Sequence, residues 1–272
     1  MRYLSLFSLG LFLLFAVSML IPALRELPRA LDAGYLLGVP EAMGRAGGIG
    51  PMLFSTLLIN GLALVMTVGL GLPLALFLWE RGDRVARHSF QRAVILAIDL
   101  LAGTPSIVFG LFGSIFFCRI LGLGYSILAG AATLAVMTLP LFARLALDAM
   151  QASPAAYRPL ARSLGLGRRT TALRILIPSV WQGLVAAVVL SWARATSEAA
   201  ALLFTAGYAT RWPESLLDSG RALPVHIFDL AMNVSGGDAM AQRAALVLLV
   251  LTTVFVVVCR KFMQGVAQWQ IT

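Results

Sequence analysis

"ASPAAYRPLARSLGLGRRTTALRILIPSVWQG", residues 152–183, predicts two short helices joined by a tight turn. Ser153 followed by Pro154 is a helix-start signal, and Gly165 is a helix-stop signal. A second helical pattern runs from Gly167 into an apolar segment, with Pro178 near its entry. Because apolar segments flank this stretch on both sides, we expect a helix, a turn and a helix held at a membrane surface.

The composition predicts an all-α membrane protein. Of 272 residues, 60% are hydrophobic and 12% are charged, and the mean hydropathy of +0.89 is far above that of a soluble domain. We predict six transmembrane helices in a single domain covering 1–272, with a core at 51–262 and a retained N-terminal helix, 3–21, at its periphery. The segments long enough to cross about 30 Å of hydrocarbon are 3–21, 51–79, 93–117, 125–149, 178–206 and 241–262.

The basic residues predict the orientation. The net charge is +9, and the arginines cluster in short loops, so membrane orientation explains them better than nucleic-acid binding. Thirteen basic residues fall on the side of the two termini and the 144–174 loop, and seven fall on the other side. This imbalance places both termini in the cytoplasm of a multi-pass protein and leaves 22–50 and 208–238 as outer loops.

Catalytic and metal-binding signals are missing from the sequence. An enzyme acting on lipid phosphates would show clustered acids or a histidine-rich loop, and the acids here are scattered. We therefore expect no metal and no cofactor, and we interpret His226 as a surface histidine of an outer loop. The chain also has no glycine-lysine phosphate loop, so any energy from ATP must come from a partner.

The 152–183 segment resembles the cytoplasmic loop of the integral-membrane permeases of bacterial ATP-binding-cassette importers. That loop carries a Glu-Ala-Ala motif, a glycine, nine residues, an isoleucine, one residue, a leucine and a proline. Gly165, Ile175 and Pro178 meet this spacing, with Ile177 in place of the leucine. The resemblance implies a MetI-like type I importer fold, with a coupling helix between the fourth and fifth membrane helices.

In these permeases the loop docks on the ATPase, which implies that the 152–177 loop does so here. An alternative is that its arginines only anchor the loop against anionic lipid. Pro159, Leu160 and Ala161 align with the Glu-Ala-Ala motif, so the glutamate is missing. A proline inside a helix removes a donor and crowds the carbonyl of Ala155, unless the helix begins at Pro159. The candidate coupling residues are Arg158, Pro159, Arg162, Gly165, Arg168, Ile175 and Pro178.

A second unusual stretch is "SWARATSEAAALLFTAG", residues 191–207, which places two charges inside an expected membrane span. At 100° per residue, Ser191, Arg194, Glu198 and Thr205 form one polar stripe on a continuous helix. An arginine at mid-membrane costs about 2.5–3.5 kcal/mol and normally faces a bundle interior or a water-filled cavity. We expect Glu198 to neutralise Arg194, and the stripe either lines an anion pathway or only fixes helix packing.

The same stretch resembles the fifth-span signature of the PstA-type permeases of phosphate importers. Identical residues include Arg194, Glu198 and Thr205, whereas Ser197, Ala199 and Ala201 replace a glycine, a threonine and a proline. Three other stretches, 46–82, 100–113 and 222–228, also resemble this subfamily in the same order. The resemblance implies a phosphate importer permease in the bacterial inner membrane. The implied partners are a PstC-like permease, PstB-like ATPase subunits and a PstS-like periplasmic phosphate-binding protein.

The sequence does not decide which anion is transported. The substitutions in the signature leave room for another oxyanion, such as phosphonate, sulfate or molybdate.

The role of Asp99 also stays open. Asp99 precedes "GTPS" at 103–106, where Gly103 and Pro105 should loosen the helix and Thr104 or Ser106 can bond the freed carbonyls. Asp99 either lines the pathway or neutralises an arginine such as Arg144 or Arg194.

Overall fold

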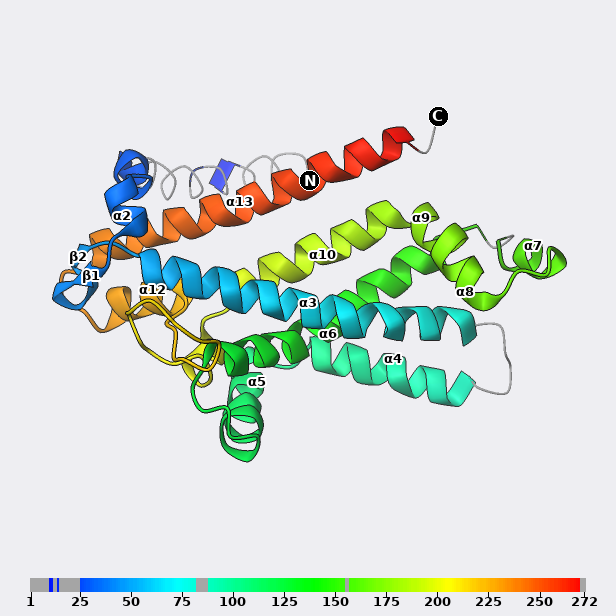
Figure 1. Cartoon of the computed structure of the whole chain (residues 1–272), viewed down its shortest axis with the longest axis horizontal. Coiled ribbons are helices and arrows are strands. Elements are labelled where there is room, and N and C mark those ends of the chain that lie inside the picture. Colours follow the sequence, from blue (N-terminus) through cyan, green and yellow to red (C-terminus); the bar gives the residue numbers. More distant parts are fainter. Residues whose placement is uncertain (1–9, 12–13, 15–24, 82–87, 155–156, 270–272) are drawn as a thin grey trace.

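The computed structural model describes residues 10–11, 14, 25–81, 88–154 and 157–269. The long helices of this part run side by side as a bundle (Figure 1). At one end, strands β1 (Pro40–Glu41) and β2 (Ala46–Gly47) form a small antiparallel hairpin that pairs Pro40 with Gly47. Within the described residues the α-helices include α2 (Ala33–Leu37), α3 (Gly50–Arg81), α4 (His88–Ala102), α5 (Ser106–Gly113), α6 (Ile127–Gln151), α7 (Tyr157–Ser163), α8 (Arg168–Thr171), α9 (Ile177–Ser179), α10 (Trp181–Thr196), α11 (Ala200–Leu203), α12 (Leu223–Met232) and α13 (Asp238–Trp269). The 3-10 helix η1 (Ala42–Gly44) and the π-helices η3 (Ser114–Ile120) and η4 (Ala172–Leu176) lie between them.

The membrane-spanning helices agree with the expected all-α membrane fold. Within the described residues, three helices are long and apolar enough to cross a membrane, and five spans result when each of two bent pairs is counted as one. The first expected span, 3–21, falls almost wholly outside the described residues. The five spans correspond in order to the other five expected from the sequence.

Helix α6 is the centre of the bundle. Of its most apolar window 67% is buried, against 11% for α13, which lies along one edge (Figure 1). Close packing against α3 is possible because Gly71 lets the Phe142 ring approach its backbone. Thr67 of α3 and Thr138 of α6 add a buried hydrogen bond of 2.7 Å between their hydroxyls. Helices α3 and α6 therefore form the frame on which the other helices pack.

The third expected span, 93–117, is not one straight helix. Helix α4 ends at Ala102, and α5 with η3 turns away by 98° (Figure 1). Pro105 lacks a backbone donor and cannot continue the α4 pattern, as the sequence predicted for this point. The Thr104 hydroxyl donates to the Leu100 carbonyl at 3.0 Å, which satisfies one of the carbonyls freed at the break.

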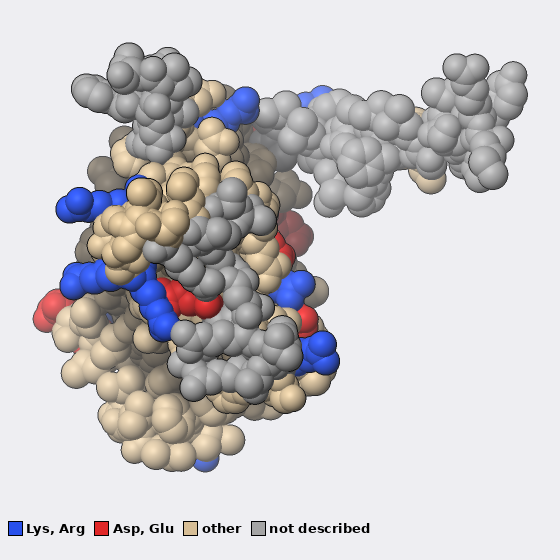
Figure 2. Space-filling model, turned by 90° about the vertical axis from the view of Figure 1, so that its right-hand side faces the viewer, with Lys and Arg blue, Asp and Glu red and all other residues tan. Residues whose placement is uncertain are grey.

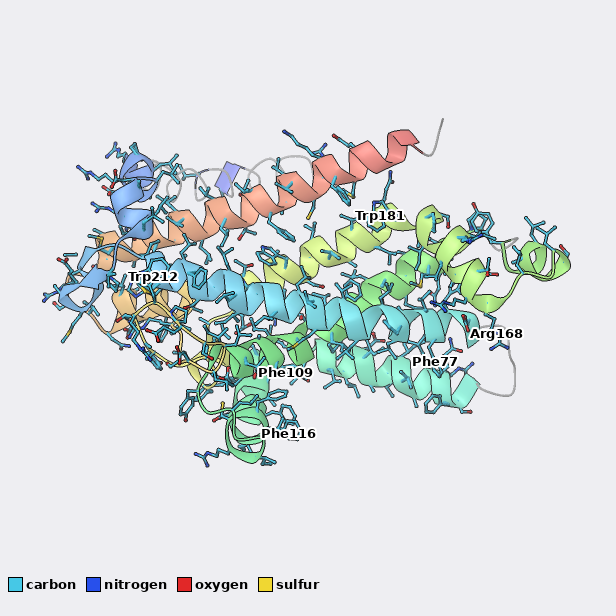
Figure 3. The ribbon with its side chains drawn as sticks, viewed as in Figure 1. Phe77, Phe109, Phe116, Arg168, Trp181 and Trp212 are labelled. Carbon is cyan, nitrogen blue, oxygen red and sulfur yellow. The ribbon has the colours of Figure 1, made fainter. Side chains whose placement is uncertain are left out.

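The two ends of the bundle differ in character. The loop end carries α7 and α8, and Figure 3 places Arg168 there. The opposite end, here called the α12 end, carries α12 and the β1–β2 hairpin, with the Trp212 ring 5.8 Å from that of Phe54 (Figure 3). Backbone bonds from Ile127 to Asp218 and from Leu128 to Leu216 tie the 207–222 connection to the start of α6.

Candidate functional site

Helix α10 ends earlier than the sequence suggested. It stops at Thr196, and α11 begins only at Ala200, so the expected continuous helix through 178–206 is wrong. The Thr196 hydroxyl donates to the Trp192 carbonyl at 2.8 Å, and the Ser197 hydroxyl donates to the Arg194 carbonyl at 3.1 Å. Hydroxyls that bond carbonyls locally compete with the next helical turn, which is consistent with a break at 197–199.

The break separates the four residues of the predicted stripe. Ser191 lies within α10 and is buried, and its hydroxyl has no hydrogen-bond partner in the described structure. Glu198 lies after the helix end, is 8% exposed and accepts a hydrogen bond from the Ala201 amide at 3.4 Å. Thr205 is fully buried and donates to the Ala201 carbonyl. Only Ser191 and Arg194 therefore share one uninterrupted helix.

The expected ion pair between Arg194 and Glu198 is not formed. Among the described residues, no carboxylate lies within 4.0 Å of the Arg194 guanidinium, whose side chain is exposed. The reason is the helix break, because residues four apart are neighbours only while the helix continues. Arg194 is therefore available to a ligand, and Glu198 instead accepts a hydrogen bond from the backbone of α11.

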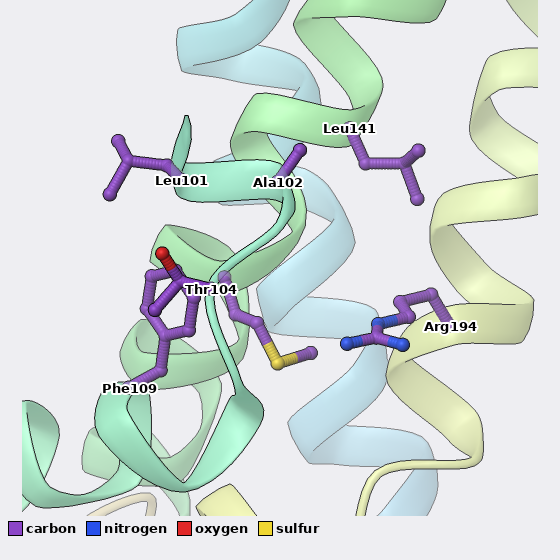
Figure 4. Close-up of a pocket in the computed structure, with 7 residues that line it drawn as sticks. Leu101, Ala102, Thr104, Phe109, Leu141 and Arg194 are labelled. Carbon is purple, nitrogen blue, oxygen red and sulfur yellow. The ribbon is translucent and has the colours of Figure 1, made fainter. Parts of the chain in front are cut away.

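The Arg194 guanidinium points into a cavity of about 140 Å³ between α10, α6 and the α4–α5 break (Figure 4). The other walls are mainly apolar, and Thr104 supplies a hydroxyl at the break. A cationic fork in such surroundings is suited to an oxyanion, which can accept two parallel hydrogen bonds from it. The residues that line the cavity are Leu101, Ala102, Thr104, Phe109, Met137, Leu141 and Arg194.

Asp99 pairs with Arg144, one of the two arginines that the sequence suggested as its partner. The Arg144 Nη1 lies 3.6 Å from the Asp99 carboxylate, and its Nε lies 3.3 Å from that of Asp148. All three side chains are between 41% and 49% exposed, so this charged cluster is on the surface of the described chain. It lies one helical turn from the cavity residues Ala102 and Leu141, on the side of the loop end.

The 152–177 loop contains the predicted turn at Gly165. Its φ of +66° is left-handed, and the Leu166 amide donates to the Ala161 carbonyl at 2.9 Å, which is the Schellman arrangement at a helix end. Within the described residues the first helix of the loop, α7, spans Tyr157–Ser163, and the Ser153 hydroxyl donates to the Met150 carbonyl. Ser153 thus closes the end of α6. The start expected at Ser153 and Pro154 depends on residues 155–156, which lie outside the described part of the structure.

Pro159 lies inside α7, two residues after Tyr157, so the helix does not begin at Pro159. The side chains of Arg158, Pro159 and Arg162 lie outside the described part of the structure.

The second half of the loop bends into the bundle. Segment 168–179, comprising α8, η4 and α9, meets α10 at 75° near Pro178 and Val180. Arg168 is exposed, whereas Ile175 and Pro178 are partly buried. Figure 2 views the molecule from the loop end, and arginine and lysine side chains stand along the rim of this face.

His226 is buried, which corrects its interpretation as a surface residue. It lies in α12 and is 1% exposed, with its imidazole against Gly44. Burial, with a further effect from the Arg221 charge, lowers the pKa of His226 to about 4, whereas Asp229 acts in the opposite direction. Arg221 donates to Asp229 at 2.9 Å and lies over the Tyr208 ring. The 208–238 segment is thus a folded part of the bundle.

Residues 68–268 match the model of the family described as binding-protein-dependent transport system inner membrane component. The chain belongs to this family. It is therefore a multi-pass membrane component of a transporter, and members of this family are non-catalytic permease subunits that work with ATPase and substrate-binding partners and a second permease. The family expected from Gly165, Ile175 and Pro178 is confirmed.

Several relatives of this family are similar over most of their length. The probable ABC transporter permease YqgI of Bacillus subtilis is 31% identical over 230 residues, covering 79% of this chain and 77% of the relative. The probable phosphate transport system permease PstA of Methanocaldococcus jannaschii is 30% identical, covering 75% and 72%. A chain of the MetNI methionine ABC transporter matches with a TM-score of 0.68 and 17% identity, covering 80% and 95%. The last likeness confirms the MetI-like fold.

Some residues of the site were not predicted from the sequence. The apolar walls Phe109, Met137 and Leu141 carry no signal of their own, because a pocket lining and a core position look alike in sequence. Asp148, in contrast, stands four residues after Arg144, and this helical spacing predicts an ion pair on its own.

Proposed function

We propose that this chain is the permease subunit of an ATP-driven phosphate importer and forms half of its translocation pathway. The observation that carries the proposal is the Arg194 guanidinium, exposed to a cavity inside an expected membrane span and without a carboxylate partner among the described residues. Such a group is costly in hydrocarbon and marks a substrate path or a water-filled cavity. Relatives named as phosphate transport system permeases, including PstA of Mycobacterium leprae at 31% identity, support phosphate as the anion.

In this proposal, direct contact with the anion is assigned to Arg194 alone. It is not assigned to the other residues expected along the pathway, which are Ser191, Thr205, Glu198 and Asp99. The guanidinium offers forked donors to the anion, and the site stays weak because it has a single cation. Asp99 and Asp148 flank Arg144 one turn closer to the loop end and keep the charge there near neutral or negative. Because Arg144 is already paired, an anion that moves from Arg194 towards the loop end meets no unpaired cation in this cluster.

A second, related permease would cover the face that carries Arg194. Thr104, Arg194 and the Asp99–Arg144–Asp148 cluster are all on the surface of this chain. Charged groups do not face lipid tails, so this face requires water or another subunit. A PstC-like permease that presents the same kind of face would enclose a wet seam between the two.

The loop end would dock on an ATPase subunit. The loop end has a short ordered projection, made of the turn at Gly165, exposed Arg168 and the bent segment 168–179. ATP binding would draw this projection and that of the partner permease together and open the pathway to the outer side, and hydrolysis would reverse this change. In this proposal the loop end and both termini lie in the cytoplasm, as the distribution of basic residues predicts, and the α12 end lies on the periplasmic side, where a phosphate-binding protein would deliver its ligand.

The test is a reconstituted complex of this chain with its partner permease and ATPase in lipid vesicles. ATP hydrolysis and anion uptake are measured with phosphate, phosphonate, sulfate and molybdate, each delivered by its binding protein. Phosphate alone should stimulate both activities. Stimulation by another oxyanion but not phosphate would reassign the substrate, and uptake without any oxyanion dependence would overturn the importer assignment.

A further inference from the structure

The last turn of α10 is tied to α3 by a buried side-chain hydrogen bond. The Asn60 Nδ2 of α3 donates to the Thr196 Oγ1 at 3.1 Å, across 136 positions of sequence. Asn60 is 2% exposed and Thr196 is 1% exposed. The same Thr196 oxygen donates its proton to the Trp192 carbonyl. The hydroxyl is therefore used in both directions, once within α10 and once towards α3.

Thr196 and Arg194 are on opposite sides of α10. Two residues of helix correspond to a rotation of about 200°, so a side chain that faces α3 at Thr196 leaves Arg194 on the far side. The exposure agrees, because Thr196 is buried and Arg194 lines the open cavity. The hydrogen bond from Asn60 thus attaches the α3-facing side of the last turn of α10 to α3. The Arg194 guanidinium projects from the opposite side of the same turn.

This bond acts at the last turn of α10. The helix ends at Thr196, and the following residues 197–199 are not helical. At its other end, α10 meets the loop segment 168–179 at a 75° bend. Apolar packing also supports the last turn, because Ala195 is buried in the core and Trp192 stacks on Phe255. A hydrogen bond is directional, so the contact from Asn60 fixes the rotation of this turn more narrowly than apolar packing does.

We propose that Asn60 is a positioning residue that fixes the end of α10 and so sets the direction of Arg194 towards the anion. The inference rests on the proposed function, because it takes Arg194 as the group that contacts the transported anion. Asn60 itself has no place in the cavity lining, so its effect on the anion is indirect. Misplacing a contact by about 1 Å can cost up to 10²-fold in reactions that depend on geometry.

The experiment uses four variants of the complete complex in vesicles. Asn60→Leu removes the donor at similar size, Thr196→Val removes the acceptor, Thr196→Ser keeps the hydroxyl, and Asn60→Leu with Thr196→Val removes both. We expect the two single disruptive variants to raise the half-saturating phosphate concentration about tenfold, with less than a twofold change in maximal rate. Thr196→Ser should transport as the wild type does.

The double variant separates positioning from simple stabilisation. Replacing both partners of a buried hydrogen bond by apolar groups can be nearly neutral for stability, whereas removing one leaves a buried polar group unsatisfied. We expect the double variant to regain thermal stability and yet to keep the raised half-saturation. Recovery of both quantities would show that the bond serves packing only and would overturn the inference.

A matched control comes from the same helix. Thr67→Val removes another buried hydroxyl contact of α3, the 2.7 Å bond to Thr138 of α6, two turns from Asn60. It should lower stability without changing the half-saturation. If Arg194→Ala transports phosphate normally in an intact complex, Arg194 does not contact the transported anion, and the inference about Asn60 is overturned with it, whereas the importer assignment is tested separately by the oxyanion panel. If Arg194→Ala is impaired while folded Asn60→Leu and Thr196→Val have wild-type half-saturation, only the role of Asn60 is overturned.

Discussion

Arg194 and Glu198 lie on opposite sides of the point where α10 ends, so the guanidinium faces an open cavity while the carboxylate is buried at the start of α11. The two charges are four residues apart and would be neighbours in a continuous helix. Their separation leaves the cation available to an anion. It also gives the two residues different roles that substitutions can separate.

Arg194→Ala should reduce phosphate uptake by about 10- to 100-fold, because a hydrogen bond to a charged group contributes about 1.5–3 kcal/mol. Arg194→Lys keeps the charge but loses the forked geometry, so an intermediate loss is expected. Uptake of labelled phosphate into vesicles measures both, with assembly of the complex checked by co-purification. Normal uptake by Arg194→Ala in an intact complex would show that the cavity is not on the path.

Glu198→Gln should preserve transport, because an amide oxygen can still accept the bond from the Ala201 amide and no ion pair with Arg194 is lost. Glu198→Ala removes this hydrogen bond to the backbone of α11 and should lower stability by about 1 kcal/mol. The measurement is apparent melting temperature together with uptake. Loss of transport in a stable Glu198→Gln variant would contradict this expectation and show that the negative charge itself is required.

Gly165→Ala should weaken the link between ATP hydrolysis and uptake. A residue with a side chain costs about 1–2 kcal/mol in the left-handed conformation that Gly165 adopts at φ +66°. Gly167→Ala is the matched control, because Gly167 has an ordinary φ of −66° and open space around it. The readout is phosphate imported per ATP hydrolysed. Equal ratios for the two variants would argue against the docking role of the loop.

Asp99→Asn should cost less than about 1 kcal/mol of stability, because the Asp99–Arg144 pair is half-exposed and spans 3.6 Å. If the face is wet, added salt should shrink the difference between variant and wild type. Thermal unfolding in detergent at two ionic strengths provides the measurement. A large, salt-independent loss would indicate that this pair is sealed away from water.

His226 should make the protein less stable in mild acid. Its folded-state pKa of about 4 lies below the ordinary 6.5, so the unfolded chain binds the proton more readily between these values. Stability present above pH 6.5 is therefore lost progressively as the pH falls towards 4. Apparent melting temperatures between pH 8 and 4 should fall less for His226→Gln than for the wild type. Parallel curves would exclude a buried neutral imidazole.

Helical type and location were predictable wherever the signal is local. The length of the apolar segments, the stop at Gly165 and the loosening at Gly103 and Pro105 depend on one residue or on one short run. These expectations agree with α3, α6, α13 and the α4–α5 break. Ser153, a typical cap residue, donates its hydroxyl hydrogen to the Met150 carbonyl near the end of α6, a contact that the sequence did not predict.

The predicted pairs and environments depended on whether a helix continued. Arg194 and Glu198 were expected to pair from spacing alone, and two hydroxyl-to-carbonyl bonds at Thr196 and Ser197 accompany the break that prevents it. Asp99, in contrast, meets Arg144 from another helix, which no spacing rule can specify. His226 looked exposed because its loop is polar, yet α12 folds back onto the bundle.

The sequence alone determined that this chain crosses the membrane several times, turns at Gly165 and belongs among importer permeases, because hydropathy, backbone conformation and motif spacing are properties of short segments. The tertiary structure decided which charged residues form ion pairs, where α10 ends, and that Asn60 of α3 donates a hydrogen bond to that end. These depend on contacts between residues far apart in the chain, such as the 136 positions from Asn60 to Thr196. Such contacts follow only from packing the helices together.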